Sequence, residues 1–130
     1  MNENIICWFE IYVRDIERAK KFYSSVLGTN FIDTNPPGDS PGGMKMSFFS
    51  AMENQGVSGA LIEMAGTKDG GGNDVNTMVY FPCKDSSVEE GRIAAAGGVV
   101  KKPKFSIGEF GFCSICVDSE GNPFGLFSME

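Results

Sequence analysis

Apolar and polar positions alternate along two matching segments, one in each half of the chain. In the first, from Ile5 to Val13, the odd-numbered positions are all apolar, whereas Trp8, Glu10 and Tyr12 carry polar groups. Strict alternation predicts a half-buried strand whose two faces differ in chemistry. The segment 76–83 repeats much of this pattern. The first strand is therefore expected to have one polar face, and candidate functional groups are sought there.

A helical pattern follows the first strand. Apolar residues recur at helical spacing over 16–27, Asp15 stands where an N-cap is needed, and Gly28 follows as a stop signal. Asp accepts hydrogen bonds from the first free N–H groups of a helix, and Gly adopts the left-handed conformation that ends one. The spacing predicts a helix over 16–27.

The second half repeats this order. Asp85 and Gly98 stand at the same offset from each other as Asp15 and Gly28 do. A second helix is predicted from about 87 to 96, capped by Asp85 or by the serine that follows it. Two copies of one unit imply a pseudo-symmetric fold.

Three further strands are predicted after each helix. In the first half they cover 30–34, 44–51 and 58–64, and in the second half 99–102, 109–117 and 123–129. The Pro- and Gly-rich segment 35–43 and the turn near 54–56 are expected to be loops. We expect one α+β domain over 1–130, made of a β-α-β-β-β module at about 5–66, a linker at 67–75 and a second module at about 76–130.

The composition of the chain excludes some classes of binding partner. A net charge of -6 and a pI near 4.6 disfavour nucleic acid and anionic membranes, which require a basic surface. No apolar run approaches the roughly 20 residues that span a bilayer. The segment Met1–Asn4 lacks both the basic and the apolar region of a signal peptide, so a cytoplasmic location is expected. The sequence contains no histidine, which excludes Ser-His and Cys-His dyads.

Four cysteines are present, and two of them have C-x-x-C spacing. Cys113 and Cys116 lie within a predicted strand, where an offset of three places side chains on opposite faces. We expect free thiols rather than a disulfide or a shared metal site.

The segment from Trp8 to Gly28, which includes Arg14-Asp15 and Phe22-Tyr23, and the turn Asp118-Ser119-Glu120-Gly121-Asn122-Pro123-Phe124 resemble the vicinal oxygen chelate superfamily. That superfamily includes glyoxalase I, bleomycin resistance proteins and extradiol dioxygenases. The resemblance covers essentially the whole chain. It implies a curved mixed sheet, built from the two modules around a central cleft, and a homodimer. One fold hosts many activities, so the reaction does not follow from it.

Enzymes of this superfamily usually hold a divalent metal with four ligands, mostly His and Glu. The resemblance places the four ligand positions at Trp8, Glu63, Met78 and Gly125. Indole nitrogen only donates, a thioether is a poor ligand for hard divalent ions, and glycine has no side chain. We expect the usual metal site to be absent, with no cofactor and no metal-dependent glyoxalase activity. A displaced divalent ion held by Glu10, Glu63 and water is the alternative.

The resemblance also implies that one set of side chains lines the concave face of the sheet. These are Trp8, Glu10, Tyr12, Phe48, Glu63, Met78 and Tyr80. Aromatic, thioether and carboxylate groups together suit a flat, aromatic or cationic small molecule. An unpaired carboxylate is costly to bury, so Glu10 is expected to contact water, a cationic partner or a ligand.

Three functions remain open. The first is a metal-free binding protein of the bleomycin-resistance type that takes up a small molecule. The second is a lyase, isomerase or dioxygenase of the same superfamily, with a displaced metal or with Glu10 and Glu63 as catalytic acid and base. The third is a partner-binding module in which Trp8 and Met78 fill the cleft as core residues.

Overall fold

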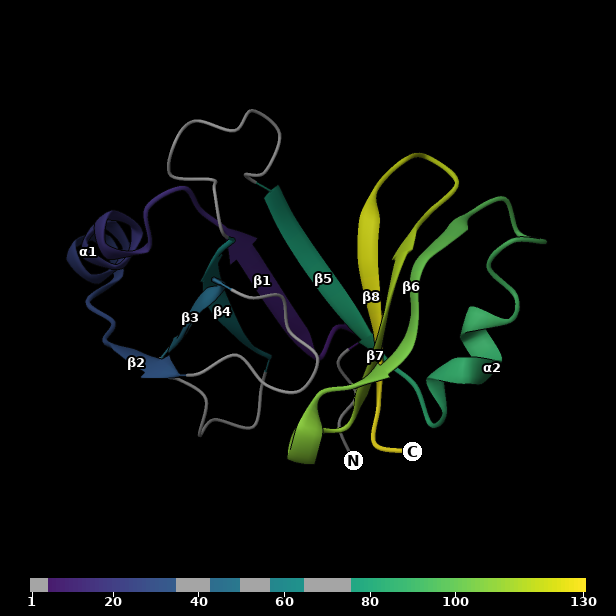
Figure 1. Cartoon of the computed structure of the whole chain (residues 1–130). Coiled ribbons are helices and arrows are strands. Elements are labelled where there is room, and N and C mark those ends of the chain that lie inside the picture. The colour runs from purple at the N-terminus through teal and green to yellow at the C-terminus, as the bar shows by residue number, and fades with distance from the viewer. Residues whose placement is uncertain (1–4, 35–42, 50–56, 65–75) are drawn as a thin grey trace. The chain divides into compact units, whose positions relative to one another are not determined.

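The computed structural model describes residues 5–34, 43–49, 57–64 and 76–130. Eight strands, two α-helices and one short 3-10 turn lie within these ranges (Figure 1). The predicted linker 67–75, the turn near 54–56 and nearly all of the predicted loop 35–43 lie outside the described residues. The described residues divide into two compact units: 8–34, 43–49, 57–64 and 76–77 belong to the first, and 5–7 and 78–130 to the second.

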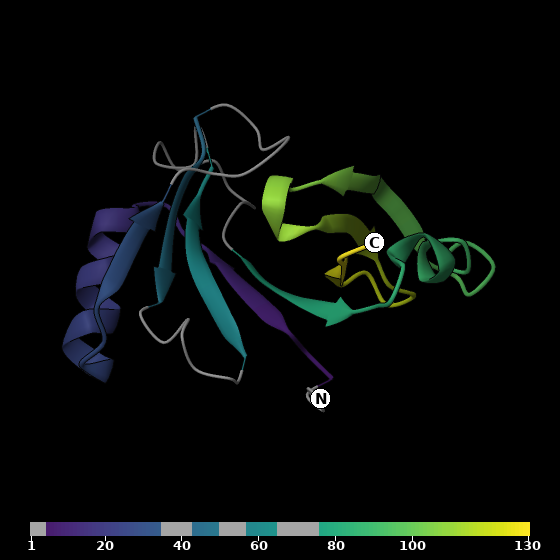
Figure 2. The ribbon, with the colours of Figure 1, turned by 90° about the horizontal axis from the view of Figure 1, so that it is seen from below.

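The first unit is a four-stranded mixed sheet with one helix. Its elements are β1 (Trp8–Tyr12), α1 (Ile16–Leu27), β2 (Phe31–Thr34), β3 (Lys45–Phe49) and β4 (Ser58–Glu63). The strands follow the order β2-β3-β4-β1, in which β1 and β4 are parallel and the other neighbours antiparallel. Helix α1 lies along one face of this sheet (Figure 2).

Helix α1 has the predicted ends. The Asp15 carboxylate accepts a hydrogen bond from the Arg18 backbone N–H at 3.1 Å. At the other end, Gly28 has a φ of 68° and its N–H donates to the Ser24 carbonyl at 2.9 Å. Within the helix only Ile16 is buried. Local capping therefore sets the ends of the helix. Its first turn attaches to the sheet through Ile16, and further along Lys20 pairs with Asp33 of β2 at 2.9 Å and the Tyr23 ring meets Phe49 of β3 at 5.9 Å between centroids.

The second unit repeats this arrangement. Its elements are β5 (Asn76–Pro82), α2 (Ser86–Glu90), β6 (Val99–Ser106), the 3-10 turn η3 (Gly108–Phe110), β7 (Phe112–Val117) and β8 (Pro123–Ser128). The strand order is β5-β8-β7-β6, with β5 and β8 parallel and the other neighbours antiparallel. Both units thus have β-α-β-β-β topology, which confirms the α+β fold class and the internal repeat.

The second helix is shorter than predicted. Asp85 caps α2 as expected, but the helix ends at Glu90, and 91–97 continue as turns. Gly91 lowers helix stability by about 1 kcal/mol relative to Ala, and the N–H groups of Arg92 and Ile93 bond three residues back, at 3.0 and 3.2 Å. The chain tightens into successive turns before it enters β6.

The hairpin between β6 and β7 also differs from expectation. Strand β6 extends to Ser106, beyond its predicted end at 102, whereas the first residues of the predicted strand 109–117 belong to η3. Gly108 and Gly111 both have positive φ, at 67° and 117°, which strand residues do not adopt.

None of the helices in the described ranges has the length and apolar character needed to cross a membrane.

Candidate ligand-binding site

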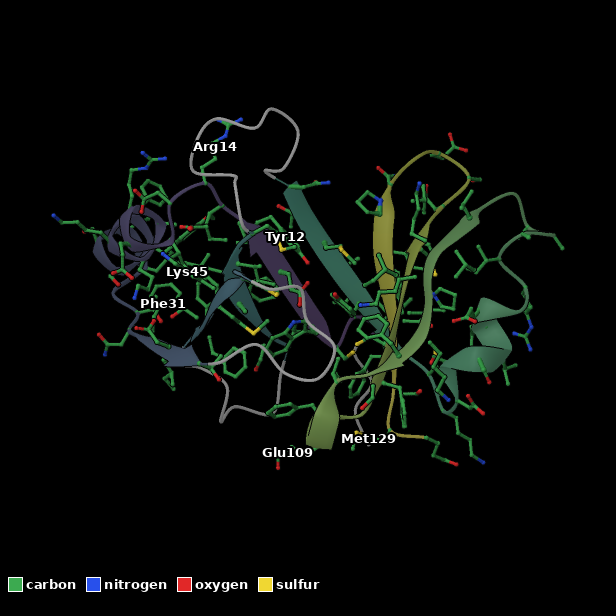
Figure 3. All side chains as sticks on the ribbon, in the orientation of Figure 1. Tyr12, Arg14, Phe31, Lys45, Glu109 and Met129 are labelled. Atoms are coloured by element: carbon green, nitrogen blue, oxygen red, sulfur yellow. The ribbon has the colours of Figure 1, made fainter. Side chains whose placement is uncertain are left out.

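The polar face of β1 places two hydrogen-bond donors around one carboxylate. Trp8 donates its indole N–H to Glu10 Oε2 at 3.1 Å, and the Tyr12 hydroxyl donates to Glu10 Oε1 at 2.7 Å. Glu10 is 7% exposed. Figure 3 shows Tyr12 on this strand. The strand alternation placed these three residues on one face, and the structure joins them through hydrogen bonds to both carboxylate oxygens.

Neighbouring strands surround this carboxylate with apolar groups. In the strand register, Ala60 of β4 stands beside Glu10 and opposite Phe48 of β3. Phe48 meets the Trp8 ring edge to face, with centroids 5.5 Å apart. The surrounding cluster consists of Met46, Ala60 and Ile62, with Trp8, Tyr12, Met44, Phe48 and Met64 packed against it. Aromatic and thioether side chains therefore enclose Glu10.

Sequence reasoning missed Ala60 and Ile62. Both are fully buried on the same face as Glu10. The alternation along 58–64 does not identify this face, because four consecutive residues of β4, from Gly59 to Ile62, are small or apolar. Only the pairing of β4 with β1 shows which side chains of β4 share the face of Glu10.

Glu63 lies on the opposite face from Glu10. Ile62 pairs with Tyr12, so the next side chain points to the face that α1 covers. There the Glu63 carboxylate accepts a hydrogen bond from the Ile16 backbone N–H at 2.9 Å, and Lys45 Nζ lies 3.7 Å away. The prediction that Glu63 shares a face with Glu10 is wrong. Glu63 anchors the start of α1.

Met78 and Tyr80 belong to β5 in the second unit, where both are buried. Tyr80 pairs with Gly125 across β5 and β8. A Cβ atom at Gly125 would overlap the Tyr80 ring, so the ring occupies the space that a side chain at this position would need. Glycine at 125 is therefore a packing requirement of β5 and β8.

The four positions matched to metal ligands do not provide a set of donors. The Trp8 indole N–H donates a hydrogen bond to Glu10 and has no lone pair for a metal. Met78 has only a thioether, and Gly125 has no side chain. The Glu63 carboxylate is engaged at the start of α1. Among the residues that the structure describes, no three His, Cys, Asp or Glu side chains gather closely enough to hold a metal ion.

The thiols of Cys113 and Cys116 project to opposite faces of β7, as their spacing predicts. Cys113 pairs with Phe127 and Cys116 with Phe124, and both side chains are buried. Burial raises the pKa of the Cys116 thiol, and the negative charge of Glu90 raises it further. A thiol in this state is a poor nucleophile.

A family model described as bleomycin resistance protein-like N-terminal matches residues 6–38. The candidate glyoxylase CFP32 of Mycobacterium bovis is 29% identical to this chain over 120 residues, and a Mycobacterium tuberculosis protein of the same name matches equally. The match covers 92% of this chain and 44% of the Mycobacterium bovis protein. The chain thus spans less than half the length of these curated relatives.

Solved structures match over nearly the whole chain. A variant of Streptomyces coelicolor methylmalonyl-CoA epimerase, in complex with 2-nitronate-propionyl-CoA, superimposes with a TM-score of 0.70 at 17% identity and covers 96% of each chain. The methylmalonyl-CoA epimerase of Mycobacterium tuberculosis gives a TM-score of 0.67 at 12% identity, over 100% of this chain and 93% of the epimerase. At such low identity these likenesses establish the fold alone.

Proposed function

Because the chain belongs to the vicinal oxygen chelate superfamily, we propose that it binds a small organic cation, without a metal ion, on the face of β1 that carries Glu10. The observation that carries this proposal is the Glu10 carboxylate, buried on an apolar face and held by both Trp8 and Tyr12.

Two neutral donors hold the carboxylate in one orientation. The hydrogen bonds from Trp8 and Tyr12 reach different oxygens, so the group cannot turn without losing one of them. A carboxylate fixed before binding loses little freedom when a ligand arrives. Glu10 is therefore suited to anchor a positively charged group.

The surroundings of Glu10 favour a flat or aromatic cation. Aromatic rings attract cations to their faces, and thioethers adapt to irregular apolar surfaces. Trp8 and Phe48 supply the rings, and Met46 the thioether. The net charge of -6 adds a long-range attraction for cations. Uptake of such a molecule also agrees with the bleomycin-resistance-like match.

Trp8 is the only tryptophan of the chain, so its fluorescence reports directly on this face. We expect benzyltrimethylammonium to change the Trp8 emission saturably, and its uncharged tert-butyl analogue neopentylbenzene to have a much smaller effect. Excess EDTA should leave the titration unchanged. Glu10→Gln should weaken binding about tenfold, the effect of one charge-assisted contact.

Glu109→Gln is the matched control, because it removes the same charge from an exposed position of the second unit. The proposal fails if Glu10→Gln binds the cation as tightly as the unchanged protein while Glu109→Gln behaves identically. It also fails if EDTA abolishes the response. Turnover without saturable binding of any cation would favour the enzymatic alternative.

We further propose that two copies of the chain associate. The curated relatives are more than twice as long as this chain, which leaves room in each for a second domain of this size. On α1, Phe22, Val26 and Leu27 are 59%, 62% and 63% exposed, an apolar surface suited to a protein partner. Light scattering should give a dimer mass, and Val26→Lys should shift it toward the monomer. A monomer at all concentrations would refute the association.

A further inference from the structure

A hollow lies in the second unit and shares no residue with the face around Glu10. It has a volume of about 280 Å³ and opens between the turns that follow α2 and the end of the β7–β8 hairpin. Ile93 and Ala96 come from the turns, and Val117 and Phe124 from the two strands. Its wall is therefore mostly apolar.

The early end of α2 creates this hollow. The turns close at Gly97, which has a φ of 99°, and the Gly98 N–H donates to the Ile93 carbonyl at 2.9 Å. A Cβ atom at Gly98 would come within 2.6 Å of the Val117 carbonyl oxygen, so glycine lets the two backbones approach closely at the base of the hollow. The Phe124 ring is fixed by an edge-to-face contact with Phe81, at 5.9 Å between centroids.

The two charged groups at the rim, Asp118 and Arg92, differ in the hydrogen bonds that they make. Asp118 Oδ1 accepts hydrogen bonds from the backbone N–H groups of Glu120 and Asn122, at 2.8 and 2.9 Å, and its other oxygen accepts from the Asn122 amide. These bonds, the Asn122 backbone bond first, lower the pKa of Asp118. Its oxygens are thus committed to the turn. By contrast, no ion pair or side-chain hydrogen bond holds the Arg92 guanidinium within the part of the chain that the structure describes.

We propose that this hollow binds a small organic anion: a carboxylate that pairs with Arg92, attached to a single ring or a branched apolar group that covers Ile93 and Phe124. A dry cavity of about 150 Å³ can hold benzene, so the present volume has room for one ring and a carboxylate. Guanidinium binds a carboxylate through two parallel hydrogen bonds, which gives the site its preference for anions.

Backbone amide NMR spectra of the whole chain, titrated with benzoate at constant ionic strength, test this site. We expect saturable shifts at Ile93, Ala96 and Gly98, and much weaker effects from benzamide, which has the same shape without the charge. Arg92→Gln should weaken benzoate binding about tenfold. Ala96→Leu should also weaken it by filling the hollow.

Arg18→Gln is the control, since it removes the same charge from an exposed turn of α1. Equal binding of benzamide and benzoate, unchanged binding by Arg92→Gln, or the absence of saturable shifts at these three amides would overturn the proposal. The cation titration uses another probe and the Trp8 emission, so the failure of either site can be recognised separately.

Discussion

The Glu63 carboxylate accepts a hydrogen bond from the backbone N–H of Ile16 at 2.9 Å, and both residues are buried. This bond ties the last residue of β4 to the first residue of α1. A carboxylate at a helix N-terminus satisfies a free N–H group and interacts favourably with the helix dipole. The side chain that the family pattern offered as a metal ligand or catalytic base therefore positions α1.

Glu63→Ala should destabilise the protein by about 1–3 kcal/mol, because it leaves the Ile16 N–H buried without its acceptor. Glu63→Gln, which keeps a carbonyl oxygen, should be destabilised less. Urea unfolding measures both effects. Both variants should bind benzyltrimethylammonium with unchanged affinity under conditions where they are folded. Lost cation binding by a stable Glu63→Gln variant would return Glu63 to the site.

Much of the fold was predictable because its signals are local. Asp15 and Gly28 act on the residues next to them, and both ends of α1 are where the sequence places them. The shared face of Trp8 and Glu10 follows from the alternation along one strand. The face of Glu63 depends instead on pairing with β1, because β4 is apolar on both sides and its alternation is ambiguous. The resemblance selected Glu63, whose side chain lies on the opposite face of the sheet. The preceding residue, Ile62, is the one that shares the face of Glu10.

Gly125→Ala should destabilise the protein by about 1–3 kcal/mol, because the added methyl group meets the Tyr80 ring and the core must shift to admit it. Thermal unfolding measures the loss. Gly121→Ala is not a neutral control, since Gly121 has a φ of 91°. The matched test is the double variant Tyr80→Leu with Gly125→Ala, in which the alanine should cost less than it does beside tyrosine. An equal cost in both backgrounds would contradict the contact.

Asp85 should make stability depend on pH in the acid range. Its hydrogen bond with Lys104 Nζ at 2.8 Å, followed by those from Ser87, lowers the pKa of the carboxyl from 3.8 to about 2. A lowered pKa in the folded state stabilises the fold above the unfolded pKa, and this contribution is lost as the pH falls from about 4 to about 2.

Asp85→Asn supplies the comparison for this effect, because asparagine still caps a helix but does not ionise. The difference in unfolding free energy between the two proteins should be constant above about pH 5 and shrink below it. High salt should reduce the difference, since the Asp85 and Lys104 side chains are 43% and 23% exposed. A difference that stays constant down to pH 2 would mean that the ion pair does not lower this pKa.

The two aromatic donors on β1 should act together through the carboxylate that they share. Tyr12→Phe removes the donor to Glu10 Oε1 and should destabilise the protein by about 1–3 kcal/mol. Tyr23→Phe on α1 should cost less, because among the described residues the Tyr23 hydroxyl has no hydrogen-bond partner. Trp8→Phe removes the donor to the other oxygen. The double variant should differ from the sum of the single changes by more than about 0.5 kcal/mol, because each bond limits the rotation of the carboxylate for the other. Urea unfolding of the four proteins gives this coupling.

If the effects of the two single changes add, or if Tyr12→Phe costs no more stability than Tyr23→Phe, the Glu10 carboxylate is not held in one orientation before a ligand binds. The proposed preference of this face for a cation would then lose its structural basis.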